Sequence, residues 1–227
     1  MWNIVYYVIL AVILLVSIGL HEYAHALVSH KLGDPTPKMQ KRLTPNPLRH
    51  LDPIGFLMIF LIHFGRWKPV QINPAYYKKR KQGELMVALA WPATNLLLAL
   101  IAILIMLIYS RILWIHGTDL QNIVDLLFQW FIAWDLVIFF WWLFAIINIA
   151  LAVFNMIPLP PLDWFRLVKS FWATGAYWMQ KYQMYIAIWF LVLILWPGKN
   201  IVWWAISGIA HALFNWIFGF LWHIIFY

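Results

Sequence analysis

The segment His21-Glu22-Tyr23-Ala24-His25 places two imidazoles and a carboxylate within five residues. On a helix, residues four apart lie one turn apart on the same face, so the two histidines would point the same way. Two imidazoles in this arrangement, with a carboxylate beside them, can hold Zn²⁺ and activate a water molecule. The HExxH spacing therefore predicts a hydrolytic zinc site with His21 and His25 as two of its ligands.

The same motif lies in a segment that we expect to be surrounded by lipid rather than water. The preceding run, Trp2 to Leu20, carries no charged residue and has the length of a membrane-spanning helix. A lone carboxylate at that depth costs roughly 2.5–3.5 kcal/mol or more, so Glu22 needs a partner or a function. The alternative is a chance match in which the histidines pack and Glu22 is neutral.

Composition indicates a membrane protein. Of the 227 residues, 65% are hydrophobic and only 11% are charged, which excludes an ordinary soluble domain. The chain contains no cysteine, so a metal would have to be held by histidine and carboxylate. The N-terminal run lacks the basic start and small-residue cleavage site of a signal peptide, and we expect it to be retained as a span.

Apolar runs predict the elements that must position the motif. We expect an all-α polytopic membrane protein with about five transmembrane helices and a short re-entrant, β-containing region after the first helix. We treat residues 1–227 as a single membrane-embedded domain, with core motifs in 17–169 and C-terminal helices in 182–226. The expected spans are about 3–30, 85–109, 131–157, 182–197 and 201–226, and the short run is about 54–64.

The distribution of positive charge predicts the orientation. Of the 16 lysines and arginines, 14 lie in residues 31–81 and 166–181, and only Arg111 and Lys199 lie in the other loops. The positive-inside rule then places the N-terminus outside, the C-terminus in the cytoplasm and HExxH toward the cytoplasmic side. These basic runs are expected to contact lipid headgroups, and we predict no nucleic-acid partner.

A hydrolytic zinc site needs three protein ligands and one open position. The third ligand must come from the other histidines or from the eight acidic residues. Most of those acids fall in outer loops or beside basic runs. Asp52 and Asp163 remain as acidic candidates on position alone.

Downstream of the 131–157 span the chain reads Asn155-Met156-Ile157-Pro158-Leu159-Pro160-Pro161-Leu162-Asp163. Together with HExxH, this segment resembles the site-2 protease family of zinc intramembrane metalloproteases, whose second signature is Asn-x-x-Pro-x-Pro-x-Leu-Asp-Gly. The resemblance covers residues 17 to about 169, with the motifs in the family's order. Three further stretches resemble the family: residues 46–55 (NPLRHLDPIG), 67–74 (WKPVQINP) and 90–95 (AWPATN).

The resemblance implies roles for individual residues. His21, His25 and Asp163 would bind one Zn²⁺ per chain, and Glu22 would be the general base. For Asp52 we expect a role in orienting a neighbour or capping a turn, with metal binding as the alternative. The polar motif residues Asn95, Asn155 and His50 are candidates to bind the substrate backbone or the oxyanion, the alternative for each being hydrogen bonding within a loop or helix end.

Two positions depart from the family pattern. Trp91 and Trp164 stand where the family has glycine, a residue that permits close backbone approach. These side chains would narrow the site, line a substrate groove or distort it. Neither change removes a ligand or the base.

We therefore expect a zinc-dependent intramembrane endopeptidase of a prokaryotic plasma membrane. Its partners would be the lipid bilayer and a substrate protein whose transmembrane helix is locally unwound, paired with the 34–75 region. The alternative is a catalytically inactive relative that acts as a membrane scaffold or regulator. A metal transporter is disfavoured because the polar residues cluster at one depth, and a di-iron desaturase because the histidine boxes are too few.

Overall fold

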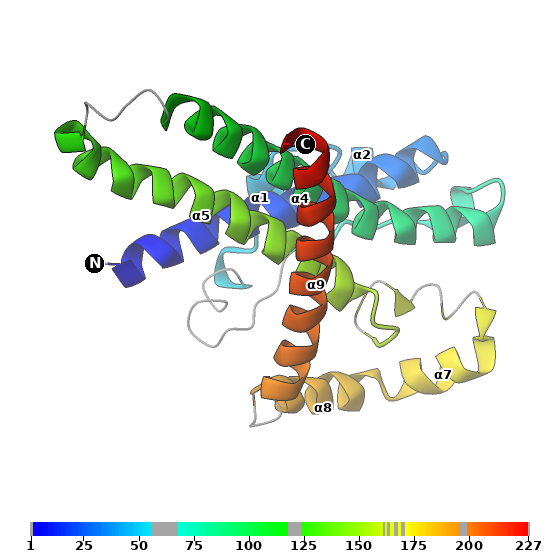
Figure 1. Ribbon diagram of the computed structural model, residues 1–227. Helices are drawn as coiled ribbons and strands as arrows, with labels where there is room; N and C mark the ends of the chain where they lie inside the picture. The colour runs from blue at the N-terminus through cyan, green and yellow to red at the C-terminus, as the bar shows by residue number, and fades with distance from the viewer. Residues whose placement is uncertain are drawn as a thin grey trace.

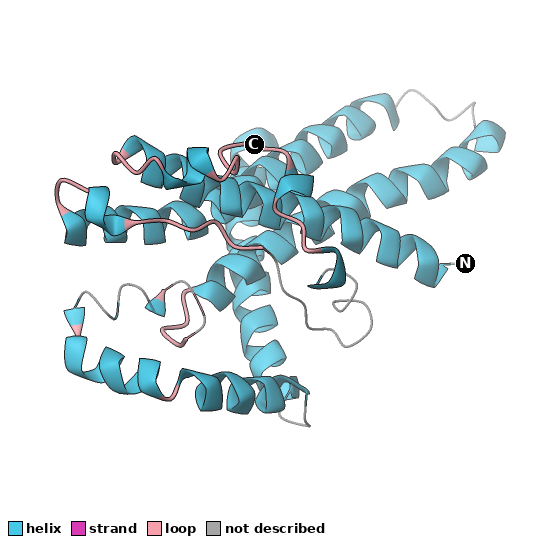
Figure 2. Ribbon diagram, turned by 180° about the vertical axis from the view of Figure 1, so that it is seen from behind, coloured by secondary structure: helices cyan, strands magenta, loops and turns pink. Residues whose placement is uncertain are grey.

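The structure, a computed structural model, describes residues 2–55, 68–117, 124–160, 162, 164–165, 168, 171–195 and 199–226. Four long helices dominate it, and no strand occurs among the described residues (Figures 1 and 2). The long helices are α1 (Trp2–Lys31), α4 (Arg80–Gly117), α5 (Val124–Asn155) and α9 (Lys199–Phe226). The short elements are α2 (Thr36–Met39), η1 (Pro47–Arg49), η2 (Pro74–Tyr76), α7 (Ala173–Lys181) and α8 (Gln183–Leu195).

Each long helix contains a stretch apolar and long enough to cross a bilayer. The four stretches are Ile4–Lys31, Arg80–Ile112, Leu136–Asn155 and Trp204–Ile225. The chain is thus an all-α polytopic membrane protein, as the sequence predicts. The described residues contain four such helices where about five were expected, because the run at 182–197 forms α8, which has only 13 residues. A straight crossing needs about 20 residues.

The long helices pack in the order α1, α4, α5, α9, with α9 crossing α5 at a steep angle in Figure 1. Their shared core is apolar and fully enclosed, and it includes Ile13 of α1, Ile103 and Leu107 of α4, Ile149 of α5 and Phe214 of α9. In a bilayer, lipid tails are as apolar as these side chains, so close packing rather than burial from water favours association.

One polar contact joins α1 to α5 inside the bundle. The Asn148 side-chain amide donates to the hydroxyl of Ser17 at 2.9 Å and to the carbonyl of Phe144, also at 2.9 Å, and both Asn148 and Ser17 are fully buried. Ser17 lies one turn before His21 on α1. This contact therefore fixes α5 against α1 near the level of the HExxH motif.

The C-terminal end of α1 is anchored by a buried carboxylate. Gly33 ends the helix with φ +105°, a conformation that glycine adopts without strain. The next residue, Asp34, accepts hydrogen bonds from the Ser29 hydroxyl (2.7 Å) and from the backbone N–H groups of Thr36 (2.9 Å) and Asn73 (2.7 Å). Burial raises the pKa of Asp34, but these donors outweigh it and hold the pKa below its usual value.

The described part of the connection between α1 and α4 consists of short helical turns and irregular chain. The predicted β content does not appear in residues 34–55 and 68–79, and residues 56–67, which contain most of the predicted re-entrant run, lie outside the described part. Three prolines, at 35, 47 and 74, open or flank the short turns here, and proline disfavours pairing into a sheet. The region is instead fastened to α1 by individual contacts.

The tightest of these contacts is between α1 and η1. A side chain on Gly19 would place its Cβ 2.5 Å from Cβ and 2.7 Å from Cα of Pro47. Glycine at position 19 therefore lets the backbone of η1 lie directly against α1, two residues before His21. Residues 46–55 are held beside the HExxH motif for this reason.

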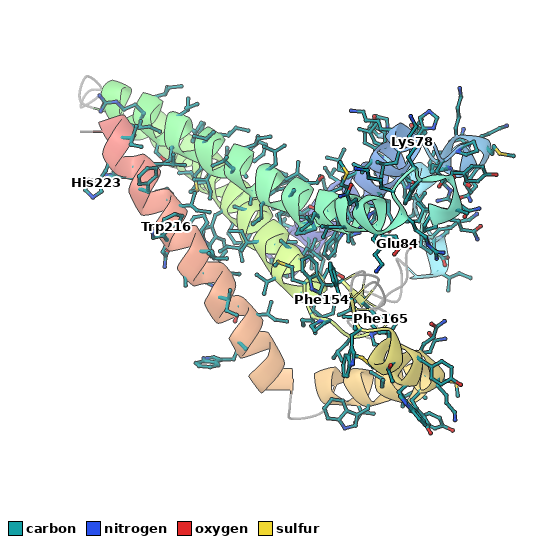
Figure 3. All side chains as sticks on the ribbon, turned by 90° about the vertical axis from the view of Figure 1, so that its right-hand side faces the viewer. Lys78, Glu84, Phe154, Phe165, Trp216 and His223 are labelled. Carbon is teal, nitrogen blue, oxygen red and sulfur yellow. The ribbon has the colours of Figure 1, made fainter. Side chains whose placement is uncertain are left out.

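After α5 the chain leaves the bundle. Figure 3 labels Phe154 near the end of α5 and Phe165 in the segment that runs on toward α7. Exposed aromatic side chains follow on α7 and α8, and the ammonium of Lys181 lies over the rings of Trp178 (5.1 Å) and Tyr182 (5.6 Å). Aromatic rings beside lysine are typical of segments at the membrane–water interface, where we expect α7 to lie.

Replacing Gly19 by alanine should separate η1 from α1. Because the clash is with proline backbone, we expect an overpacking cost of roughly 1–3 kcal/mol and a lower Tm in detergent. Gly208, in α9, has no atom within 4 Å of an added Cβ. Gly208→Ala is the matched control and should leave the Tm unchanged or raise it; an equal loss in both variants would contradict the close approach.

Candidate metal site

The histidine pair lies on one buried face of α1. The ring centroids of His21 and His25 are 5.2 Å apart with the planes at 78°, and each residue is only 6% exposed. The Nδ1 of His25 is 3.1 Å from the carbonyl oxygen of Val87 on α4. A carbonyl only accepts, so Nδ1 carries the proton and Nε2 presents the lone pair. A backbone carbonyl that orients an imidazole in this way is the usual support for a metal ligand.

Glu22 is held by a backbone amide from another part of the chain. The N–H of Val70 donates to Oε2 of Glu22 at 2.8 Å, and Oε1 lies 3.9 Å from Nε2 of His21. Glu22 is buried within α1. Oε2 therefore accepts a backbone hydrogen bond, and Oε1 lies on the side of His21.

The segment that supplies this amide is itself fixed at several points. The N–H of Lys68 donates to the carbonyl of His50 at 3.2 Å, and its own carbonyl accepts from Arg42 at 3.3 Å. The N–H of Gln71 donates to the Gln40 side chain at 3.3 Å. The described part of the 67–74 motif, residues 68–74, thus contacts the 46–55 motif and positions the Glu22 carboxylate.

Trp91 lies against both histidines. Its ring centroid is 4.5 Å from that of His21 with the planes at 90°, and 6.3 Å from that of His25 with the planes at 13°. The indole is completely buried. The side chain that replaces the family's glycine thus packs directly against the histidine pair. Trp164 is half-buried in the turn after α5 and, in the described part of the chain, makes no ring contact with either histidine.

The three candidate substrate-binding residues have different surroundings. Asn95 follows Trp91 by one turn of α4 and is fully buried, and neither its Oδ1 nor its Nδ2 has a hydrogen-bond partner among the described residues. Asn155, at the end of α5, donates to the carbonyl of Leu151 on its own helix at 3.1 Å. Only Asn95 is buried with both amide atoms available to a ligand.

His50 is fully buried, and its Nε2–H donates to the carbonyl of Thr44 at 3.1 Å. Burial lowers the pKa of His50, the Thr44 carbonyl opposes this, and the positive charge of Arg42 lowers the pKa further. The imidazole is neutral at pH 7 as a result. Its Nδ1 has no partner in the described structure, so it remains a possible hydrogen-bond acceptor.

The third predicted ligand, Asp163, lies outside the described residues. Within the described part no cluster of three histidine or acidic side chains forms a metal site. Asp52 instead accepts a long contact of 3.5 Å from the N–H of Gly55, as expected of a residue that caps a turn. The pair His21 and His25 nevertheless fits Zn²⁺, because the ring oriented by Val87 presents Nε2 beside a second buried imidazole and a carboxylate.

Several supports of the site could not be found from residue types. The Val70 N–H and the Val87 carbonyl are backbone groups, which every non-proline residue carries. The sequence around Asp34 shows an acid near basic loops and gives no sign of the three hydrogen bonds that its buried carboxylate accepts. The motif resemblance at 67–74 was the one signal that pointed to the Val70 segment.

Comparisons with known proteins agree on one family. The description "Peptidase family M50" matches residues 9–196. The protein named "Putative zinc metalloprotease YwhC" of Bacillus subtilis is 34% identical over 197 residues, covering 86% of this chain and 84% of its own. "Putative zinc metalloprotease Rip2" of Mycobacterium tuberculosis is 26% identical over 215 residues, covering 88% of this chain and 74% of its own. No solved structure matches significantly.

The Val70–Glu22 contact predicts different stabilities for two substitutions of Glu22. Glutamine keeps an oxygen that can accept the Val70 N–H, so Glu22→Gln should unfold near the wild-type Tm. Alanine leaves a buried N–H unsatisfied, at a cost of about 1–3 kcal/mol, and Glu22→Ala should have a clearly lower Tm. Thermal unfolding in detergent measures both, and equal Tm values for the two variants would show that the contact does not stabilise the fold.

Proposed function

The chain belongs to Peptidase family M50, the site-2 proteases, and from that membership we propose that it is a zinc-dependent intramembrane endopeptidase that cleaves transmembrane segments of membrane-tethered substrates. The observation that carries the proposal is the Glu22 carboxylate, fixed by the Val70 N–H beside two buried imidazoles within a membrane-spanning helix. Placing a carboxylate within a membrane-spanning helix costs free energy, so its presence there favours a functional role.

In the proposed enzyme His21 and His25 hold one Zn²⁺ per chain, with Asp163 as the third protein ligand. Bound there, the ion would supply Lewis-acid polarisation of the scissile carbonyl and acidify a water molecule. The Val87 carbonyl keeps the proton of His25 on Nδ1, which leaves Nε2 for the ligand. Trp91 and the surrounding helices exclude bulk water from the imidazoles.

Glu22 is the proposed general base. Its Oε2 stays with Val70, and the oxygen on the side of His21 takes a proton from water and passes it to the leaving amide nitrogen. The fixed carboxylate needs little reorganisation before it reacts. The Val70 amide thereby couples the 68–71 segment to catalysis.

The substrate backbone must be unwound to be cut, because a helical amide is hydrogen-bonded to its own chain. Asn95 is placed to bind an unwound peptide group, since its amide is buried with no partner in the described part of the chain. Asn155 and His50 are weaker proposals, because Asn155 already donates to Leu151 and His50 to Thr44. The described stretches 34–55 and 68–75 would lie alongside the extended substrate.

We further propose a prokaryotic plasma membrane as the location, with the N-terminus outside and the active site toward the cytoplasm. The basic residues in 31–81 support this orientation. A cytoplasmic C-terminus requires a fifth crossing by the residues around α8.

The base proposal predicts loss of cleavage without loss of metal. In liposomes that contain single-span substrates, Glu22→Gln should reduce cleavage by about 10²–10⁴-fold, the usual contribution of a general base. Its zinc content should equal that of the wild type, since no ligand is removed. Zinc without cleavage in the wild type, across a panel of single-span substrates, would favour the inactive-scaffold alternative.

The ligand proposal predicts a contrast between two acids. Loss of a group that merely supports a ligand weakens metal affinity about 10–100-fold, so loss of a ligand should cost at least as much. Asp163→Ala should therefore copurify with little zinc, whereas Asp52→Ala should retain a full equivalent. Zinc stoichiometry by elemental analysis decides between the two acids, and retention by Asp163→Ala would remove that residue from the site.

A further inference from the structure

The indole N–H of Trp91 is a buried donor beside the histidine pair. An indole nitrogen can only donate, and buried tryptophans usually find an acceptor for it. In the described structure this Nε1 has no partner, although the residue is completely buried and its ring contacts His21. A donor in that position is explained most simply by an acceptor that arrives with a ligand.

A second orphaned group lies one turn further along α4. Asn95 follows Trp91 by four residues, which places both on one face of the helix. Both amide atoms of Asn95 are buried without partners in the described residues. Together the two side chains offer two donor nitrogens and one acceptor oxygen, separated by one helical turn.

An extended peptide has the complementary groups. Its unpaired backbone presents carbonyl acceptors and N–H donors at short intervals, whereas a substrate that is still helical has used both internally. The Trp91 Nε1–H and the Asn95 Nδ2 can each bind a carbonyl, and the Asn95 Oδ1 can bind an N–H. Both side chains are completely buried, and only an unwound substrate segment has free backbone groups to pair with them.

We propose that the Trp91 indole N–H is a catalytic donor to the substrate, binding the carbonyl oxygen at or next to the scissile bond, with Asn95 binding the adjoining peptide group. The inference rests on the proposed protease function. Trp91 stands where the resembled motif has glycine, a residue that carries no side-chain donor. The face of α4 that carries residues 91 and 95 thus recognises peptide backbone.

The test distinguishes the effect of the indole N–H from the packing of the aromatic ring. Trp91→Phe keeps an aromatic wall against the histidines but removes the donor, so kcat/KM for a single-span substrate in liposomes should fall by about 10²–10³-fold, as when one oxyanion donor is lost. Zinc content should stay at the wild-type level. The Tm should be unchanged or raised, because an unsatisfied buried donor has been removed. Trp142→Phe, in the half-buried layer of α5 away from the site, is the matched control and should keep full activity.

A purely structural role for Trp91 gives a different pattern. Wild-type kcat/KM in Trp91→Phe would overturn the proposal, as would a loss of activity that parallels loss of zinc or Tm. If Trp91→Phe does not fold, the benzothienyl analogue of tryptophan, introduced at position 91 alone, keeps the ring shape and lacks the N–H, and the same outcomes apply. Binding of the substrate peptide to zinc-loaded Glu22→Gln, with and without Trp91→Phe, gives a second readout, and equal affinities would also count against the donor.

The two proposals fail in distinguishable ways. Cleavage by the wild type that Trp91→Phe leaves unchanged overturns the donor and leaves the protease function standing. No cleavage by a zinc-loaded wild type overturns the protease function, and the donor with it.

Discussion

The arrangement of the whole N-terminal half depends on keeping a carboxylate and two imidazoles inside a membrane helix without bulk water. Each of these polar groups must be satisfied by protein, since an unsatisfied group in hydrocarbon costs several kcal/mol. The protein does this with backbone: the Val70 N–H for Glu22 and the Val87 carbonyl for His25. Helix α4 and the segment 68–71 are therefore bound to α1 by the same groups that make the site chemically useful.

The contacts that hold the Glu22 carboxylate in place depend on further contacts away from the site. The neighbours of Val70 hold its segment in place: Lys68 and Gln71 are bonded to partners in residues 40–50. That region in turn lies against α1 because Gly19 has no side chain. Gly19, which lies two residues before His21 on the same helix and has no side chain to react, thus supports the geometry of the carboxylate through these contacts.

Much of this could be predicted from sequence. Long apolar runs predicted the four membrane-spanning helices, and the spacing of His21 and His25 predicted their common face. The fifth span and the β content were the exceptions: α8 is a 13-residue helix, and the described part of 34–75 forms proline-flanked turns. A hydropathy pattern reports how apolar a segment is, whereas the length of its helix depends on where tertiary contacts allow it to begin and end.

The site shows a similar division. Residue types identified the histidines and Glu22, and the motif resemblance drew attention to Trp91 and Asn95. The partners that orient them were not predictable, because a backbone N–H or carbonyl has no signature in the sequence. Asn155 and His50 illustrate the opposite case, in which a motif position proves to be hydrogen-bonded to its own helix or loop.

The paired attachments of Glu22 to Val70 and of Asp34 to Asn73 have a consequence for how this protein can vary. They close the chain between α1 and residue 73 into a loop with both ends fixed, one at the site and one at the helix terminus. The entropy of closing a flexible loop grows only with the logarithm of its length, by about 0.6 kcal/mol per doubling. A longer connection to the 68–73 segment therefore adds little to the cost of closure, while the two contacts keep the carboxylate in register. The position of the 68–73 segment is thus set by its two contacts with α1 and its end rather than by the number of residues that precede it.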